Sequence, residues 1–234
     1  MQPIPLENPD VRDCSDLLTV MADPDCRCDG PAYEMFRGLA LNDMDKKWLE
    51  EQQIRYDITR IPGQAICGEW IKTKGHYHQP APDGHDFPEI YEVLEGEALY
   101  LLQKIDLSDI VLVKARKGDL VLIPPGYGHV TINPFKDTLL MANLVSSAFT
   151  SEYLPFENMQ GAAYYLFADG RQERNPRYPD TLPAMRTVTC YGKLLPKPFP
   201  QKALYPCVGD EKSLAFLNKP GSFLKEYQEL YLFT

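Results

Sequence analysis

Basic residues, histidines and long apolar runs are all scarce in this chain of 234 residues. Lys and Arg number 24 against 33 Asp and Glu, and the formal net charge of −9 argues against a general surface for nucleic acids or anionic membranes. No apolar run approaches the ~20 residues that a membrane-spanning helix needs. The first residues lack the basic start and apolar stretch of a signal peptide. We therefore expect a cytoplasmic protein with no nucleic-acid or membrane partner.

Cysteine is sparse as well, and six residues over this length do not predict a disulfide framework. Cys26 and Cys28 form a Cys-x-Cys pair, with Cys14 upstream. A zinc site of cysteines usually needs a second well-spaced pair, which the sequence does not show. We therefore expect Cys14, Cys26 and Cys28 to be ordinary reduced thiols.

Short β-prone segments fill the middle of the chain, from Tyr56 to about Val145, and Gly, Pro, Asn or Asp separate most of them. The segments are YDITRI, AICGEWI, EIYEVLE, EALYLLQ, IVLVKA, DLVLIP, HVTINP and TLLMANLV. Many short strands at close spacing predict an all-β sandwich or barrel. The region shows no alternation of strands and helices, which argues against a parallel α/β sheet.

The two flanks have different patterns. The stretch from Asn42 to Gln53 predicts a helix, with Asn42 as its N-cap and acidic residues in the first turn. After Thr150, AAYYLF predicts a further strand, two proline-rich segments predict extended arms, and SFLKEYQELYLF (222–233) predicts a short helix. We expect an N-terminal arm and helix over 1–53, a barrel over 54–170, and an extension over 171–234 that packs on the barrel or on a partner subunit.

Histidine occurs only four times, yet two histidines stand at alternate positions. His76 and His78 would share one face of a strand, Glu89 begins the next β-prone segment, and His129 follows a Pro-Pro-Gly turn. A His-x-His pair alone is more often a surface pair than a ligand set. Three imidazoles and a carboxylate together favour a divalent metal site with open coordination positions, as catalysis requires. The remaining histidine, His85, is expected to be a solvated loop residue.

These motifs, GHYH, PEIYEVLEGEALYLLQ and GDLVLIPPGYGHVTIN, resemble the two conserved motifs of the cupin superfamily. The arrangement Thr-x-Gly-His-x-His before a Glu-x-Tyr strand resembles the cupin-type (archaeal) glucose-6-phosphate isomerases, over about residues 50–150. The resemblance implies an all-β cupin fold, that is, a double-stranded β-helix or jelly-roll barrel. Edge strands of such barrels can be covered by self-association, so we also expect a homodimer.

The resemblance also implies a set of site residues. The metal would be Fe²⁺, with Mn²⁺, Zn²⁺ or Ni²⁺ as alternatives, and its ligands would be His76, His78, Glu89 and His129. A phosphorylated hexose would be held by Thr59, Thr73 and the backbone N–H of Gly75, with Tyr91 near the sugar. The family has a histidine after the last barrel strand that is missing here, and Tyr153 is the candidate to replace it.

Interconversion of glucose 6-phosphate and fructose 6-phosphate through an enediolate needs a base beside C1 and C2 and a positive centre for the oxyanion. Glu89 is the candidate base. The alternative is a metal-promoted hydride shift with Glu89 as a ligand only, and the sequence leaves both open. The same ligand set would also serve a mononuclear iron dioxygenase or a non-catalytic sugar-binding cupin. The Thr-x-Gly turn favours the isomerase.

Overall fold

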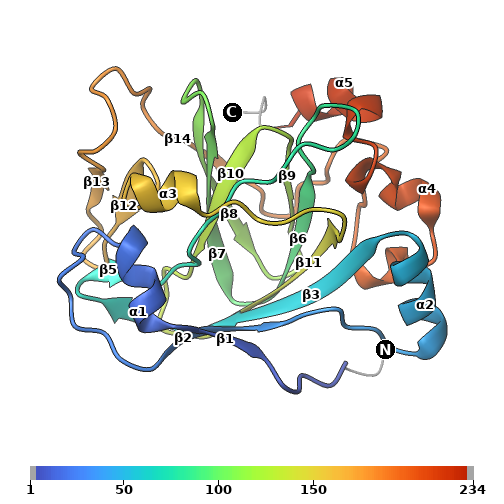
Figure 1. Ribbon diagram of the computed structural model, residues 1–234, viewed down its shortest axis with the longest axis horizontal. Helices are drawn as coiled ribbons and strands as arrows, with labels where there is room; N and C mark the ends of the chain where they lie inside the picture. Colours follow the sequence, from blue (N-terminus) through green and yellow to red (C-terminus); the bar gives the residue numbers. More distant parts are fainter. Residues whose placement is uncertain (1–3, 231–234) are drawn as a thin grey trace.

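Two β-sheets face each other and enclose the core, which confirms the predicted all-β cupin barrel (Figure 1). The structure, a computed structural model, describes residues 4–230. The first sheet has the strand order β1 (Asp10–Asp13), β2 (Pro31–Phe36), β3 (Ile54–Ile61), β11 (Leu139–Ser146), β6 (Glu89–Glu95) and β9 (Leu120–Ile123). The second has the order β10 (Tyr127–Ile132), β7 (Glu97–Lys104), β8 (Ile110–Arg116) and β14 (Arg186–Thr189). The neighbouring strands are antiparallel except for β14, which runs parallel to β8.

Each of the eight β-prone segments between Tyr56 and Val145 overlaps a strand of the structure. AICGEWI forms a hairpin of two short strands, β4 (Ala65–Ile66) and β5 (Glu69–Trp70), because Cys67 and Gly68 both adopt positive φ in the turn between them. AAYYLF contains β12 (Tyr164–Leu166), which pairs with β13 (Gln172–Arg174). Alternation of apolar residues and turn residues was therefore a sufficient signal for the barrel strands.

The N-terminal segment contributes strands as well as the predicted helix. Helix α2 (Asp43–Glu51) begins where expected, and the backbone N–H of Asp45 donates to the side chain of Asn42 at 2.9 Å. Ahead of it lie α1 (Cys14–Leu17), a 3₁₀ turn, and the strands β1 and β2, which extend the first sheet beyond β3. The first sheet therefore includes residues on both sides of the expected boundary at 53.

The expectation of reduced thiols at Cys14, Cys26 and Cys28 is wrong, because two disulfides join Cys14 to Cys28 and Cys26 to Cys67. Their Cα–Cα distances of 5.5 and 6.2 Å lie in the range that disulfides need. The Cys26–Cys67 disulfide could not be predicted from spacing, because Cys67 lies 41 residues beyond Cys26. The two cysteines meet only when the β4–β5 hairpin has folded back to the N-terminal segment. The first disulfide closes the segment between β1 and β2 on itself, and the second ties that segment to the β4–β5 hairpin.

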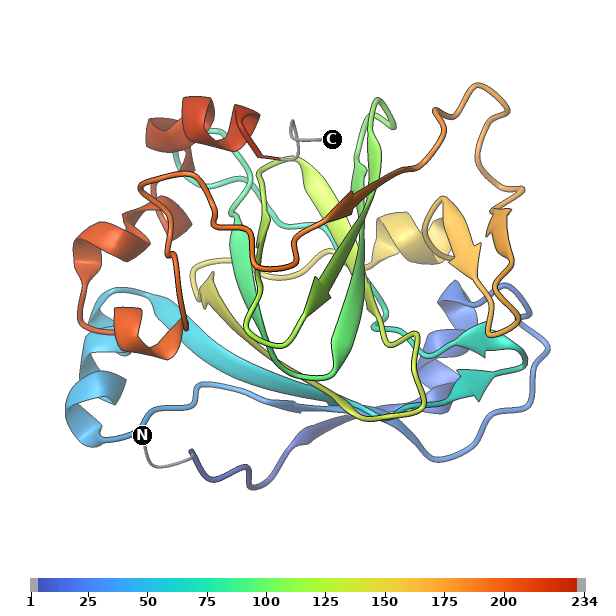
Figure 2. The same cartoon turned by 180° about the vertical axis from the view of Figure 1, so that it is seen from behind.

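The C-terminal segment packs on the barrel of its own chain. Figure 2 shows β14 and the chain after it lying against the barrel and leading to the C-terminal helices. The backbone N–H of Leu204 donates to Oε2 of Glu92 at 2.7 Å, and Asn218 bonds both the carbonyl of Gln52 and the hydroxyl of Ser146. Two short helices follow, α4 (Glu211–Leu214) and α5 (Leu224–Gln228). Another short helix, α3 (Leu154–Asn158), lies earlier in the chain, between β11 and β12. The helix expected over 222–233 is thus shorter, and its last residues, 231–233, lie outside the described part of the chain.

Between residues 4 and 230, none of the helices has the length and apolar character needed to cross a bilayer.

Candidate functional site

Four side chains that were predicted to bind a metal converge between the two sheets. They are His76, His78, Glu89 and His129, and one ligand atom of each lies within 4.8 Å of those of the others. Glu89 begins β6 in the first sheet, and His129 lies in β10 of the second sheet. The two remaining histidines come from the extended segment before β6. The group therefore forms only when both sheets and this segment are in place.

Backbone pairing fixes the histidines. The N–H of His76 donates to the carbonyl of His129 at 3.2 Å, and the N–H of His129 donates back at 3.1 Å. Nδ1 of His78 lies 2.7 Å from the carbonyl oxygen of Phe87, so this nitrogen carries the proton and donates. Nε2 of His78 points the other way and lies 3.0 Å from Nε2 of His76. A carbonyl that holds the far nitrogen is the usual support of a metal-binding histidine.

Glu89 presents one carboxylate oxygen to the histidines. Nδ2 of Asn143 donates to Oε1 at 2.6 Å. The other oxygen, Oε2, is buried without a hydrogen-bond donor and lies 3.3 Å from Nε2 of both His78 and His129. A buried carboxylate oxygen without a donor is costly. A divalent ion among these four groups would satisfy it, so the residues fit a metal of this kind.

The charges of the group suit a cation. Burial, reinforced by the neighbouring imidazoles, lowers the pKa of His76 well below its usual range, and burial also lowers the pKa of His129. Burial by itself would raise the pKa of Glu89, but its contacts with His129 and His78 hold that pKa well below the usual range. Near neutral pH the site thus has neutral imidazoles at His76 and His129 and a charged carboxylate.

Tyr91, predicted to lie near the sugar, also reaches the ligand group. Its hydroxyl lies 3.0 Å from Nε2 of His129. Burial, together with the charge of Glu89, raises the pKa of Tyr91 well above its usual range, so the hydroxyl keeps its proton. Tyr91 can therefore donate a hydrogen bond inside the cavity.

The inner face of the first sheet forms one wall of a cavity beside the ligand group. Side chains at alternate positions share this face, and the strand register aligns them in rows across β3, β11 and β6. The rows are Arg55–Val145–Glu89, Asp57–Asn143–Tyr91 and Thr59–Met141–Val93. All but Val93 line the cavity, which encloses about 620 Å³ including its open mouth.

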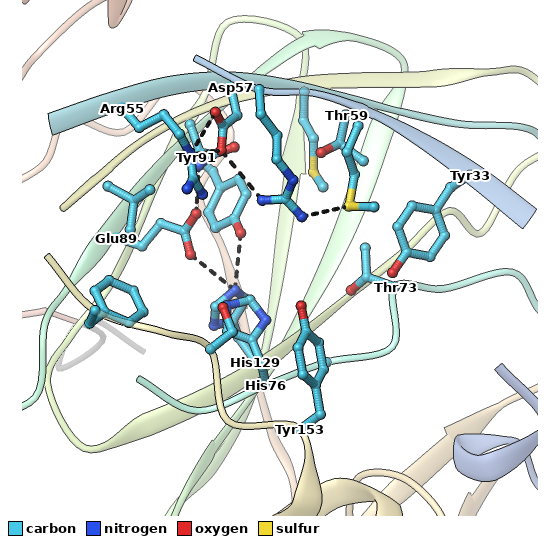
Figure 3. Close-up of a pocket in the computed structure, with 18 residues that line it drawn as sticks. Tyr33, Arg55, Asp57, Thr59, Thr73, His76, Glu89, Tyr91, His129 and Tyr153 are labelled. Carbon is cyan, nitrogen blue, oxygen red and sulfur yellow. Dashed lines mark hydrogen bonds and ion pairs between the residues drawn. The ribbon is translucent and has the colours of Figure 1, made fainter. Parts of the chain in front are cut away.

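The predicted phosphate-binding residues line the same cavity on the side away from Glu89. Figure 3 shows Glu89 and Tyr91 on one side, Thr73 on the other, and Asp57 and Thr59 along the wall between them. Thr73 Oγ1 accepts from the backbone N–H of Thr131 at 2.9 Å, so its own hydrogen is left to donate elsewhere. The structure thus brings all eight predicted site residues around one space, with His78 just behind the lining.

The structure gives a physical reason for glycine at position 75. Gly75 has φ of +76°, and a Cβ at this position would come within 2.5 Å of a side-chain methyl of Val130 and 3.1 Å of the carbonyl of His129. The glycine is therefore required by its left-handed backbone and by close packing on β10. The predicted contact of the Gly75 N–H with a phosphate is independent of this packing and stays a prediction.

Several lining residues were missed. Arg55 and Asp57 could have been found by extending the alternation of Thr59 along β3, whereas Asn143 lies on β11, which has no predicted site residue. Arg37 could not, because β2 was not predicted. Tyr153, the candidate to replace the missing histidine, does line the cavity, and its ring centroid lies 5.6 Å from that of His76. His85 is half-buried and lies outside the ligand group.

Two facing β-sheets with three histidines and a glutamate between them define the chain as a cupin with a candidate metal centre. The profile of the family described as Glucose-6-phosphate isomerase (GPI) matches residues 11–182. The chain belongs to this family of isomerases, as its cupin motifs suggested. The match begins at β1 and ends before β14, so it includes every lining residue of the cavity.

Comparison with solved structures gives distant similarities. A variant of oxalate decarboxylase from Bacillus subtilis shares 12% identity at a TM-score of 0.35, over 52% of this chain and 26% of that chain. Oxalate decarboxylase from Lactobacillus farciminis shares 17% at 0.38, over 55% and 33%. Vicilin from hazelnut, Corylus avellana, shares 15% at 0.39, over 54% and 33%. These chains are matched over a third of their length or less, and none of the curated proteins compared is a significant match.

Proposed function

We propose that the chain is a metal-dependent glucose-6-phosphate isomerase that interconverts glucose 6-phosphate and fructose 6-phosphate. One observation carries the proposal: three of the four candidate metal ligands line the same cavity as the predicted sugar- and phosphate-binding residues, and the fourth, His78, contacts His76 directly behind them, in a chain of an isomerase family. The iron-dioxygenase and non-catalytic alternatives share the ligand group, but the family match supports neither.

The metal would be held by His76, His78, Glu89 and His129, with Fe²⁺ as the first choice and Mn²⁺, Zn²⁺ or Ni²⁺ as alternatives. When bound, a divalent ion supplies positive charge that polarises the carbonyl and hydroxyl oxygens of the sugar. The structure supports this assignment through the buried oxygen of Glu89 that has no donor.

The residues of the chain have distinct parts in this proposal. Asn143 holds Oε1 of Glu89 and so leaves Oε2 directed to the histidines. Glu89 is the candidate base for moving a proton between C1 and C2, and Tyr91 keeps a proton with which it can bond a sugar oxygen. Thr59 and Thr73 are proposed to donate to the phosphate at the far side of the cavity. The hydride-shift alternative makes Glu89 a ligand only.

A coupled assay tests the proposal. Fructose 6-phosphate conversion is followed with a glucose-6-phosphate dehydrogenase, on protein as purified, after removal of metal by a chelator, and after addition of each of the four ions. We expect activity to fall with chelation and to return with Fe²⁺ or another of the ions. Full activity in the metal-free protein would contradict the metal-dependent mechanism. The same reaction in D₂O separates the two chemistries, because a proton held by Glu89 exchanges with solvent and a hydride does not.

We also propose a homodimer and a cytoplasmic location. Strand β1 forms an exposed edge of the first sheet, and such edges are commonly covered by association. Disulfides are uncommon in cytosolic proteins, so the two found here give this location no support. The proposed location rests on the proposed substrate, because hexose phosphates are intracellular. Light scattering after gel filtration tests the dimer, and cell fractionation tests the location.

A further inference from the structure

Arg37 lines the cavity directly after β2, and no sequence motif indicated it. Its side chain is 36% exposed and lies between two acidic groups. Nε donates to Oδ2 of Asp10 at 3.1 Å, and Nη1 lies 3.8 Å from Oδ2 of Asp57. These contacts fix the guanidinium group in the wall of the cavity.

The two Nη nitrogens of Arg37 are poorly satisfied. At 3.8 Å, Nη1 is too far from Oδ2 of Asp57 for a hydrogen bond. The two oxygens of Asp57 accept instead from Nε of Arg55 and from the N–H of Gly38. Nη2 contacts the sulfur of Met35 at 3.1 Å, and a thioether is a weak acceptor. Among the described residues, neither Nη atom has a hydrogen-bonded oxygen partner. The terminal N–H groups of Arg37 are therefore available to an anionic ligand.

The position of Arg37 corresponds to the phosphate side of the cavity. Met35 lies directly opposite Thr59 in the pairing of β2 with β3, so the end of the guanidinium that contacts Met35 lies beside Thr59. Strand β2 is separated from β6, which carries Glu89, by β3 and β11. Three strand spacings are about 14 Å, and side chains from both strands reach into this width. A six-carbon sugar can therefore have its reactive end near Glu89 and its phosphate near Arg37.

Two further cations lie near the same side. The guanidinium of Arg12 lies 5.7 Å from the centroid of the Tyr153 ring, and Nζ of Lys74 lies 5.8 Å from it. Nε of Arg12 is buried without a partner. Asp16 and Glu157 pair with these cations, and none of the four residues lines the cavity itself. Arg37 is therefore the cation of this side that reaches the cavity lining.

We propose that Arg37 is the charged contact that makes this cavity select phosphorylated sugars over unphosphorylated ones. The inference rests on the proposed function for the identity of the sugar. A guanidinium presents two parallel N–H groups that match two phosphate oxygens, and the threonine hydroxyls can complete the contact. Arg37 would act in binding and discrimination, whereas the metal-side residues would act on C1 and C2.

The experiment compares binding of sorbitol 6-phosphate and sorbitol, which cannot isomerise, by calorimetry on the metal-loaded protein. Arg37→Gln removes the charge, and Arg37→Lys keeps the charge but loses the two parallel N–H groups of the guanidinium. Arg60→Gln is the matched control, because Arg60 lies on β3, is 44% exposed, pairs with Glu34 and is absent from the cavity lining. Melting temperature and metal content are measured for each variant to detect a purely structural effect.

We expect Arg37→Gln to weaken sorbitol 6-phosphate binding by at least about tenfold, to leave sorbitol binding and metal content unchanged, and to raise KM for fructose 6-phosphate much more than it lowers kcat. Arg37→Lys should recover part of the affinity, and Arg60→Gln should resemble the parent. Equal weakening of both ligands, or no weakening, overturns the inference. A parent protein that binds the phosphate ester selectively but isomerises nothing would refute the proposed function and leave the role of Arg37 standing.

Discussion

The metal-free protein should lose stability between pH 7.5 and pH 5.5 because of its buried histidines. Burial lowers the pKa of both His76 and His129 in the folded state from the ordinary value of 6.5. The unfolded chain then binds more protons below about pH 6.5, so stability is present above this pH and is lost as the pH falls through it. The lowered pKa of Glu89 acts only near and below about pH 4.3, outside this window.

The size of the effect follows from linkage. At pH 5.5 a histidine with an unfolded pKa of 6.5 that stays neutral in the fold costs about 1.4 kcal/mol of folding free energy. His76 and His129 together therefore account for up to about 3 kcal/mol. This is a large part of the stability of a typical domain, about 5–15 kcal/mol.

Urea unfolding of chelator-treated protein at the two pH values measures this difference. His76→Asn should remove up to about 1.4 kcal/mol of the pH dependence. His85→Asn is the control for removing a histidine that lies outside the ligand group. Added divalent ion should stabilise the parent more at pH 7.5 than at pH 5.5, because it binds neutral imidazoles. If His76→Asn and the parent lose the same stability between the two values, the assignment of His76 as a neutral, buried group is incorrect.

Three further outcomes are expected. His78→Ala should abolish both metal content and isomerase activity, as measured by elemental analysis and the coupled assay; retained metal would argue against the ligand group. Thr73→Val should weaken hexose phosphate binding by about 1.5–3 kcal/mol while Thr73→Ser retains it, and calorimetry showing equal affinity for all three proteins would exclude the hydroxyl contact. Thiol titration of the denatured protein should detect two free thiols before reduction and six after it, and six thiols without reduction would exclude both disulfides. The double variant Cys26→Ser/Cys67→Ser should lower the free energy of unfolding in urea by up to about 4 kcal/mol.

Local sequence patterns were sufficient for the central barrel and for the metal side of the site. Glu89 and His129 could be placed because each stands at the start of a predicted strand, whereas Thr59 came from the resemblance to the isomerase family. His76 and His78 were found because two rare residues occupied alternate positions. Asn42 was recognised as an N-cap because its side chain acts on the backbone only three residues away.

The remaining features depend on contacts between distant segments. Strand β2 has no regular alternation, and it is a strand because β3 offers it an edge, so Arg37 could not be placed in the cavity. Cys67 meets Cys26 only after the β4–β5 hairpin has folded against the N-terminal loop. The reason for glycine at 75 is a side chain of β10, more than fifty positions later, which no local rule could include.

The order of strands in the first sheet divides the cavity between a central and a peripheral part. Glu89 and Asn143 lie on strands with a neighbour on either side, whereas Arg37 follows a strand covered on one edge only by the four residues of β1. Substitutions near Arg37 therefore disturb fewer contacts than substitutions around Glu89. Over evolutionary time, the preference for a sugar substituent could change at this edge while the reaction centre stayed the same, and laboratory selection for new substrates should accumulate its changes there first.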